Sequence, residues 1–153
     1  MKLQVDVQYA FNGAGVPDET SIATWARAAF RGHPGVAWEL VVRIVDKKES
    51  ATLNRRYRHK SGPTNVLSFA YDSAETPLRG QRELLGDIVI CGPIVEREAA
   101  ARGGDAVAHW AHMVVHGIMH LRGYDHVDED EARIMEHLES QVMQRLGFAD
   151  PYA

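Results

Sequence analysis

The chain has 153 residues, of which 45% are hydrophobic and 25% charged, as in an ordinary globular domain. Its one cysteine, Cys91, excludes a disulfide scaffold and a structural zinc site built from several thiolates. Lys and Arg number 17 against 21 Asp and Glu, and this net charge of −4 disfavours a protein that coats nucleic acid by bulk charge. Without a long apolar run or a signal-peptide pattern, we expect a cytoplasmic protein with no membrane partner.

Hydrophobic periodicity predicts strands and helices that alternate over most of the chain, followed by helices alone. Alternating apolar and polar side chains indicate half-buried strands, and apolar residues three or four positions apart indicate helices. The predicted strands cover residues 2–10, 38–44, 66–71 and 84–91, with an exposed loop over 72–83. The predicted helices run from Asp18 to the Gly32, Pro34 and Gly35 segment, over about 47–57, from Pro93 to Gly103, over about 106–122 and over about 128–146.

Acidic residues mark where three of these helices begin. Asp46 precedes Glu49 by three residues and Asp128 precedes Glu131 by three, a spacing typical of capping boxes, and Asp105 caps the helix between them. No linker or repeat divides the chain. We therefore expect a single α+β domain over residues 1–153, with a small mixed four-stranded sheet and about five helices packed mainly on one face.

Histidines are concentrated in the second half of the chain: six of the eight lie within 29 residues. His116 and His120 are four residues apart on a predicted helix, so both rings leave the same face one turn apart. Gly123 can adopt the left-handed conformation that ends a helix, which lets His126 turn back toward the same point. Three imidazoles with a fourth position open are typical of a catalytic zinc site, so we predict one zinc ion on this buried helix and the turn after it.

A single buried histidine is more often a hydrogen-bonded core residue than a metal ligand, and only the three-histidine pattern on an apolar helix favours the metal. For His112 we expect contact with the ligands or simple packing, and not metal binding. Asp125, beside the third histidine, either supports the metal site or is a surface carboxylate of the turn, and the sequence leaves both interpretations open.

The spacing His-x3-His-x5-His equals that of the metzincin peptidases, but Gly117 occupies the position of their glutamate general base. The absence of this glutamate disfavours peptidase chemistry. A zinc metallopeptidase or another small hydrolase nevertheless remains an alternative hypothesis at this point.

Residues 54–69, with the sequence NRRYRHKSGPTNVLSF, contain the densest positive charge of the chain. These cations either form a solvated helix end or make an anion-binding wall for phosphate. The second interpretation makes Arg55, Arg56 and Lys60 candidate RNA contacts, and a basic patch beside a metal suits a nuclease better than a peptidase.

Several blocks of this sequence resemble those of a known family. HGIMHLRGYDH (116–126), preceded by HWAHMVVHG, resembles the signature of the YbeY family of bacterial endoribonucleases, also called ribosomal RNA maturation factors. NRRYRHKSGPTNVLSF, LLGDIVIC (84–91) and the ending LGFADPY are similar to further blocks of this family. The chain departs from the family at 59–62, where His-Lys-Ser-Gly replaces the usual Gly-Lys-Asp-Lys.

The resemblance implies a small metallohydrolase with zinc held by His116, His120 and His126, and with Arg58 important for activity. It implies a single-strand-specific endoribonuclease that matures the 3′ end of small-subunit ribosomal RNA and acts in ribosome quality control. The implied partners are single-stranded ribosomal RNA and the ribosome or its small subunit, and DNA is not expected among them. A non-catalytic ribosome-assembly factor with structural zinc is a further alternative.

Overall fold

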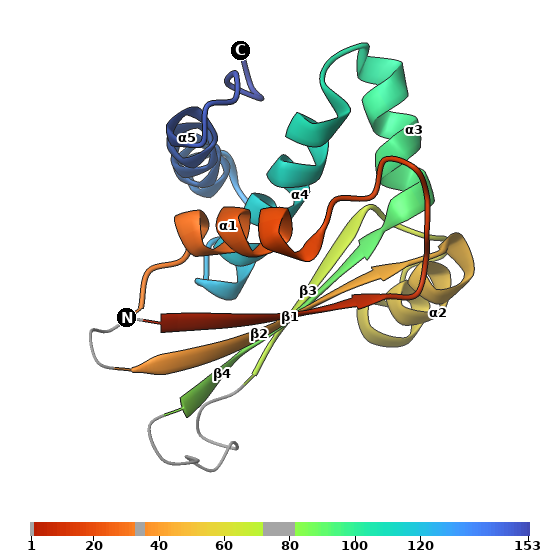
Figure 1. Cartoon of the computed structure of the whole chain (residues 1–153), viewed down its shortest axis with the longest axis horizontal. Helices are drawn as coiled ribbons and strands as arrows, with labels where there is room; N and C mark the ends of the chain where they lie inside the picture. Colours follow the sequence, from red (N-terminus) through yellow and green to blue (C-terminus); the bar gives the residue numbers. More distant parts are fainter. Residues whose placement is uncertain (1, 33–35, 72–81) are drawn as a thin grey trace.

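The computed structural model describes residues 2–32, 36–71 and 82–153, and its elements follow the predicted order. Strands alternate with helices up to a two-strand unit, and three helices complete the chain (Figure 1). The strands are β1 (Lys2–Tyr9), β2 (Ala37–Val45), β3 (Val66–Ala70) and β4 (Arg82–Cys91). The helices are α1 (Glu19–Ala29), α2 (Lys47–Arg58), α3 (Gly92–Arg102), α4 (Ala106–Leu121) and α5 (Glu129–Arg145).

The four strands form one mixed sheet in the order β1-β2-β4-β3. β2 pairs in parallel with both β1 and β4, whereas β3 is antiparallel to β4 and forms an edge of the sheet. This confirms the predicted α+β class with a mixed four-stranded sheet. β3 matters most for the site, because α4 packs beside it.

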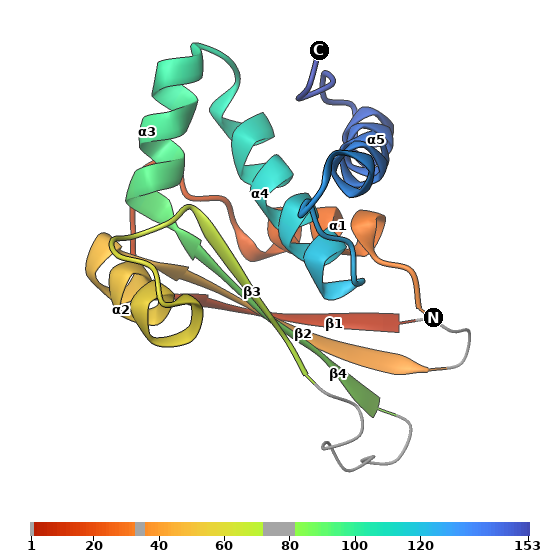
Figure 2. The same cartoon turned by 180° about the vertical axis from the view of Figure 1, so that it is seen from behind.

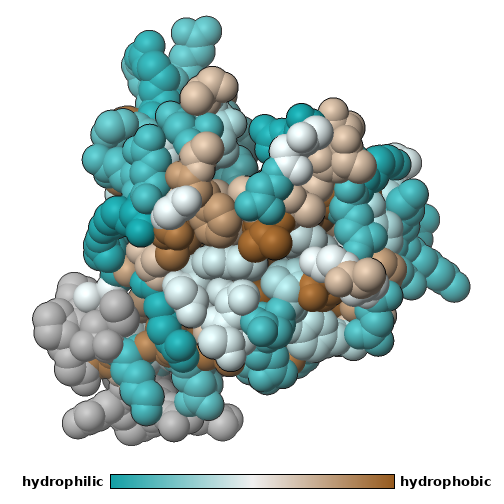
Figure 3. All heavy atoms as spheres, turned by 45° about the horizontal axis from the view of Figure 1, so that its top comes forward, coloured by the Kyte–Doolittle hydropathy of each residue, from teal (hydrophilic) through white to brown (hydrophobic). Residues whose placement is uncertain are grey.

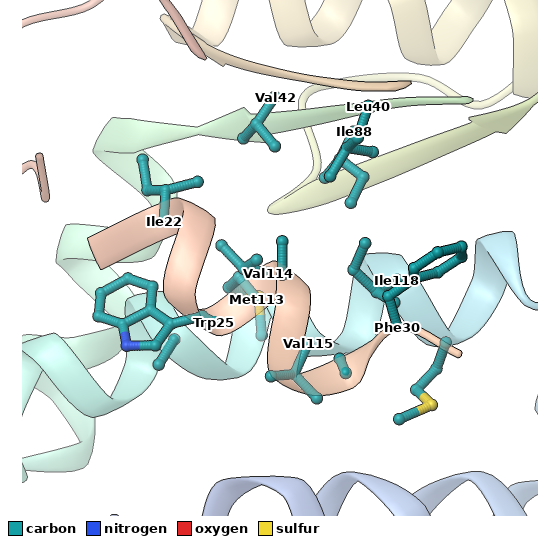
Figure 4. Packing of buried hydrophobic residues seen from close by; sticks show 14 of the residues in the cluster. Ile22, Trp25, Phe30, Leu40, Val42, Ile88, Met113, Val114, Val115 and Ile118 are labelled. Atoms are coloured by element: carbon teal, nitrogen blue, oxygen red, sulfur yellow. The ribbon is translucent and has the colours of Figure 1, made fainter. Parts of the chain in front are cut away.

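The main hydrophobic core lies between the sheet and the pair α1 and α4, and α5 packs on the outer side of α4 (Figures 1 and 2). Figure 4 shows Ile22 of α1 with Val114 and Ile118 of α4 on the sides of their helices that face the sheet. There they meet Val42 and Ile88, and all five side chains are fully buried. This packing explains why α4 is apolar on nearly every side: it is enclosed by the sheet and two helices.

The opposite face of the sheet is covered by α2. Val45, Val89 and Cys91 form a second buried cluster there, against which Leu53 of α2 packs. Cys91 is fully buried, and burial raises the pKa of its thiol, so it is a core residue as its strand pattern predicts. The helices therefore lie mainly, but not entirely, on one face.

The predicted helix caps are present. The side chains of Asp46, Asp105 and Asp128 each accept a hydrogen bond from a backbone N–H of the first helical turn. Glu49 does not complete a reciprocal capping box, because its carboxylate accepts two hydrogen bonds from Arg43, at 2.6 and 3.1 Å. α2 is thus anchored to the neighbouring strand by the residue expected to close its own cap.

Two predicted boundaries differ from the observed ones or lie outside the described residues. The expected loop over 72–83 is two residues too long, since β4 already begins at Arg82, and residues 72–81 lie outside the described part of the chain. α1 ends at Ala29 with Phe30 as its cap, and the predicted stop signals Pro34 and Gly35 also lie outside the described residues.

The surface seen in Figure 3 is mostly hydrophilic or neutral, with apolar residues in small separate areas. Among the residues that the structure describes, no helix combines the length and the apolar character needed to cross a membrane.

Candidate metal centre

Three histidines meet where α4 ends. One ring nitrogen from each of His116, His120 and His126 lies within 4.8 Å of the other two, and the Nε2 atoms of His116 and His120 are 3.1 Å apart. Their ring centroids are separated by 4.7 to 5.6 Å. The predicted spacing therefore brings the three imidazoles together at one point, in a cluster whose donor atoms can hold a metal ion.

The donor set and its dimensions fit zinc. A tetrahedral zinc ion about 2.0–2.1 Å from each imidazole nitrogen holds those nitrogens about 3.4 Å apart, close to the 3.1 Å between His116 and His120. Burial, and the positive charge that His116 and His126 would carry, lower the pKa of His120. A lowered pKa keeps the imidazole neutral near pH 7, and only the neutral form offers a lone pair to a metal.

The turn after α4 brings the third histidine back to the first two. Gly123 has φ +97°, the left-handed conformation that ends a helix. Its N–H donates to the carbonyl of His120 at 3.0 Å, and the N–H of Tyr124 donates to the carbonyl of Met119 at 3.1 Å. These two bonds define a Schellman motif, which reverses the chain so that His126 faces the end of the helix.

A buried carboxylate fixes the orientation of His116. Glu139 of α5 is 0% exposed, and its Oε1 accepts hydrogen bonds from Nδ1 of His116 at 2.9 Å and from Nε2 of His112 at 2.8 Å. Because Nδ1 of His116 carries the shared proton, its Nε2 keeps a free lone pair facing His120. A carboxylate behind a histidine is the usual support of a metal ligand.

Tyr152 completes this group from the end of the chain. Its hydroxyl donates to Oε2 of Glu139 at 3.1 Å and lies 3.2 Å from Nε2 of His112. Burial by itself would raise the pKa of Glu139, but the hydrogen bonds from His112 and His116 outweigh it and lower the pKa to about 2. Glu139 is therefore an ionised and fully buried hydrogen-bond acceptor.

The sequence reasoning did not find Glu139, although one signal was present. On α5 the apolar stripe includes Met135 and Val142, and Glu139 lies between them at helical spacing. A carboxylate in the middle of a buried stripe needs a partner, and its partners are histidines of another helix. Tyr152 gave no such signal, because nothing local relates it to α4.

The two expected supporting residues differ in their contacts. His112 is buried and donates to the same oxygen of Glu139 as His116 does. It therefore contacts the carboxylate that orients His116, and it packs beside the candidate ligands without belonging to the three-histidine cluster. Asp125 is exposed, and its Oδ1 accepts from the backbone N–H of His126 at 2.8 Å. That oxygen lies 3.9 Å from Nδ1 of His126, too far for a hydrogen bond to this nitrogen, so Asp125 shapes the turn.

The histidine cluster opens into a cavity of about 310 Å³, which also contains part of the basic segment. Arg58 lines it, and its Nη2 donates to the carbonyl of Ser68 on β3 at 2.9 Å. A guanidinium has five N–H donors, and among the described residues this hydrogen bond engages one of them. Lys60 lines the same cavity, whereas Arg55 and Arg56 do not. The structure thus brings two of the four predicted basic residues to the histidines and leaves two on the exposed surface of α2.

Two buried polar side chains of α2 hold the loop that connects it to β3. Ser50 donates to the carbonyl of Thr64 and accepts from its N–H, both at 3.0 Å, and Asn54 donates to the carbonyl of Gly62 at 2.8 Å. His59 ends α2 with φ +57°, a left-handed conformation. Residues 59–62, where the sequence departs from the family pattern, therefore lie in a loop that α2 holds in place. Lys60 of this loop lines the cavity.

Gly117 allows α4 to approach the sheet closely. A Cβ atom at this position would lie 2.9 Å from two side-chain carbons of Ile88 on β4. Its carbonyl also accepts a hydrogen bond from Ser68 of β3 at 3.1 Å. The position that holds the general base in metzincins is thus directed into the core, and a glutamate could not fit there without displacing the helix.

The fold and the site define a small α+β protein with a three-histidine cluster that can hold a metal ion, next to a basic cavity wall. The family model of Endoribonuclease YbeY matches residues 16–147. A relative from Alcanivorax borkumensis with that name is 49% identical over 150 residues, covering 97% of this chain and 86% of its own length. Another from Methylococcus capsulatus is 52% identical over 139 residues, covering 91% of this chain and 89% of its own. The chain belongs to the Endoribonuclease YbeY family.

A solved structure agrees with this fold. The solution structure of a Thermotoga maritima protein has a TM-score of 0.53 to this chain at 20% identity, covering 97% of this chain and 98% of that one. At this level of identity the likeness concerns the fold alone.

Proposed function

We propose that this protein is a zinc-dependent endoribonuclease that cleaves single-stranded RNA. The observation that supports it most is that Arg58 lines the same cavity as the three histidines. A candidate metal site and a guanidinium that can bind phosphate therefore lie side by side. Membership of the Endoribonuclease YbeY family supports the same reaction. The family resemblance also supports ribosomal RNA as the substrate, at the 3′ end of the small-subunit RNA, and a role in ribosome quality control in the cytoplasm.

In this proposal His116, His120 and His126 hold the zinc ion. Bound zinc supplies a Lewis acid and lowers the pKa of a coordinated water toward 7. Glu139 keeps the proton on Nδ1 of His116, so that Nε2 stays a ligand throughout the reaction. Arg58 donates N–H groups other than the one bonded to Ser68 to the phosphoryl oxygens, where negative charge develops during cleavage.

The basic residues divide into two groups by position. Arg58 and Lys60 line the cavity and contact the phosphates nearest the metal, whereas Arg55 and Arg56 lie outside it and attract the RNA as it continues over α2. Removing Arg56 should raise the KM and reduce the salt dependence of binding, with little effect on kcat. Removing Arg58 should act mainly on kcat, by about 100-fold or more, as for other donors to a developing charge.

The test compares His116→Ala and Arg58→Ala with the wild-type protein on single-stranded RNA, with and without a chelator. His116→Ala should lose both zinc and cleavage, whereas Arg58→Ala should keep zinc and lose most of its rate. Lys48→Ala removes an exposed positive charge from the first turn of the same helix, outside the cavity, and serves as the matched control. RNA cleavage that persists in the presence of chelator contradicts the proposal.

The same proteins discriminate the alternatives. Peptide hydrolysis lost on chelation, without RNA cleavage, would identify a peptidase, which the packing of Gly117 against Ile88 disfavours. Ribosome co-sedimentation that His120→Ala leaves unchanged, again without RNA cleavage, would identify an assembly factor with structural zinc.

A further inference from the structure

The last turn of α2 presents two side chains on neighbouring faces of the helix. Residues four apart on a helix lie on the same face. Arg58 follows Asn54 in this way, and both line the cavity of the histidines. Tyr57 follows Leu53, which packs on the second buried cluster. The helix thus directs Tyr57 toward the sheet and Arg58, one residue later, toward the cavity.

The ring of Tyr57 is anchored to the sheet but is not enclosed. Its centroid lies 5.3 Å from that of Phe69 on β3, and the two ring planes are 65° apart, an edge-to-face contact. Phe69 in turn packs against the second buried cluster. Tyr57 is nevertheless 56% exposed. An aromatic ring that is fixed on one side and open to solvent over half of its surface can bind another flat group.

This aromatic pair lies directly beside the cavity wall. Phe69 follows Ser68, whose carbonyl accepts the hydrogen bond from Arg58 at 2.9 Å. The aromatic contact and the hydrogen bond therefore join α2 to β3 at consecutive residues of both elements. An RNA strand with one phosphate at Arg58 passes the ring of Tyr57 as it continues over α2.

Arg56 supplies a second flat surface. Its guanidinium carbon lies over the Tyr57 ring, 6.0 Å from the ring centroid. Carbon atoms in optimal contact are about 3.5 Å apart, so a nucleobase between the ring and the guanidinium would separate them by about 7 Å. Arg56 is exposed and has a long, flexible side chain, so a small shift makes this space. Unstacked RNA bases bind to aromatic rings and to guanidinium planes alike.

We propose that Tyr57 stacks on a nucleobase of the RNA substrate close to the cleaved bond, with Arg56 on the other face of the base. The inference rests on the proposed RNA cleavage. Such a site does not depend on the identity of the base, because every base has a π-face. It does require a base free of its neighbours, which a duplex does not offer. Tyr57 would therefore help to select single strands.

The test compares the zinc-loaded wild type with Tyr57 variants on a single-stranded oligonucleotide that is cleaved at one site. Tyr57→Ala should raise the KM about 5- to 150-fold, the usual contribution of one base stacked on an aromatic side chain, with a smaller effect on kcat. Tyr57→Leu keeps an apolar contact with Phe69 but lacks a flat ring, so it should show the same defect. Tyr57→Phe keeps the ring and should retain the KM of the wild type.

Substrates with one abasic nucleotide, placed in turn at each position near the cleaved bond, identify the stacked base. At one position the missing base should raise the KM of the wild type by a similar factor. On that substrate the penalty of Tyr57→Ala should vanish, because nothing remains for the ring to bind. A ring that only covers Phe69 does not predict this, since a packing defect would persist on every substrate.

Ile134→Ala is the matched control, because Ile134 of α5 is an equally exposed apolar side chain, at 55%, and does not line the cavity of the histidines. It should keep the KM of the wild type. Zinc content and thermal unfolding of all variants verify that they are intact. An unchanged KM in Tyr57→Ala and Tyr57→Leu, a defect in Tyr57→Phe as large as theirs, or a penalty that is equal on every abasic substrate overturns the stacking site and leaves the proposed function standing. Failure of the wild type to cleave the intact oligonucleotide overturns both.

Discussion

The substitution Glu139→Gln tests whether the buried carboxylate positions the metal centre. Oε1 of Glu139 accepts from both His112 and His116, and Oε2 accepts from Tyr152. Glutamine has nearly the same shape, and its single oxygen can replace Oε1 while its NH₂ group faces the Tyr152 hydroxyl. The variant therefore keeps the packing of α4 against α5, removes the negative charge and replaces the acceptor of the Tyr152 hydroxyl by a donor.

The expected loss follows from the two histidine bonds. Hydrogen bonds to a charged group contribute about 1.5–3 kcal/mol each and neutral ones about 0.5–1.5 kcal/mol, so the loss of charge at Glu139 should cost about 2 kcal/mol of metal-free stability in all. Zinc affinity should fall about 10- to 100-fold, because His116 is less firmly held and a weaker ligand. Glu139→Ala should cost more, about 3–5 kcal/mol, since it also removes packing at a fully buried position and leaves Nδ1 of His116 without its acceptor.

Urea unfolding of the metal-free protein measures the first effect, and zinc competition against a chromophoric chelator measures the second. Glu136→Gln, an exposed carboxylate on the same helix, is the control and should change neither. If folded Glu139→Gln binds zinc as tightly as the wild type, then Glu139 does not position His116 and the reasoning is refuted.

Three further predictions concern packing, the loop before β3 and pH. Gly117→Ala should lower stability in urea by about 1 kcal/mol, since overpacking against Ile88 exceeds the gain in helix propensity; a stabilised variant contradicts this. Ser50→Ala should cost about 1–3 kcal/mol by leaving the Thr64 N–H unpaired, and an unchanged urea midpoint would refute it. Burial lowers the pKa of His109, so the unfolded chain binds this proton more readily. Metal-free stability should fall below about pH 6.5, and His109→Gln should flatten that dependence.

The candidate metal ligands could be predicted because their geometry is local. His116 and His120 are related by one helical turn, and the conformation of Gly123 determines where the next residues go. Each of these relations spans fewer than ten residues. The three histidines could therefore be grouped without knowing which helices and strands pack against one another.

The support of the site could not be predicted in the same way. Glu139 of α5 meets His116 of α4, and Glu98 of α3 meets His109 on the same α4, so both contacts depend on tertiary packing. Periodicity does not state which polar residue of one helix faces which of another. The side chain of Glu49 illustrates the same limit, because a tertiary bond to Arg43 replaced the expected local one.

The three histidines differ in how firmly the fold holds them. His116 and His120 project from a buried helix, whereas His126 follows the turn and has a side chain that is 55% exposed. A bound metal ion should therefore dissociate in steps. His126 should detach first, while His116 and His120 still coordinate the ion. The rate of metal exchange would then depend on the motion of one short turn, and a substitution at Gly123 should alter that rate more than the final affinity.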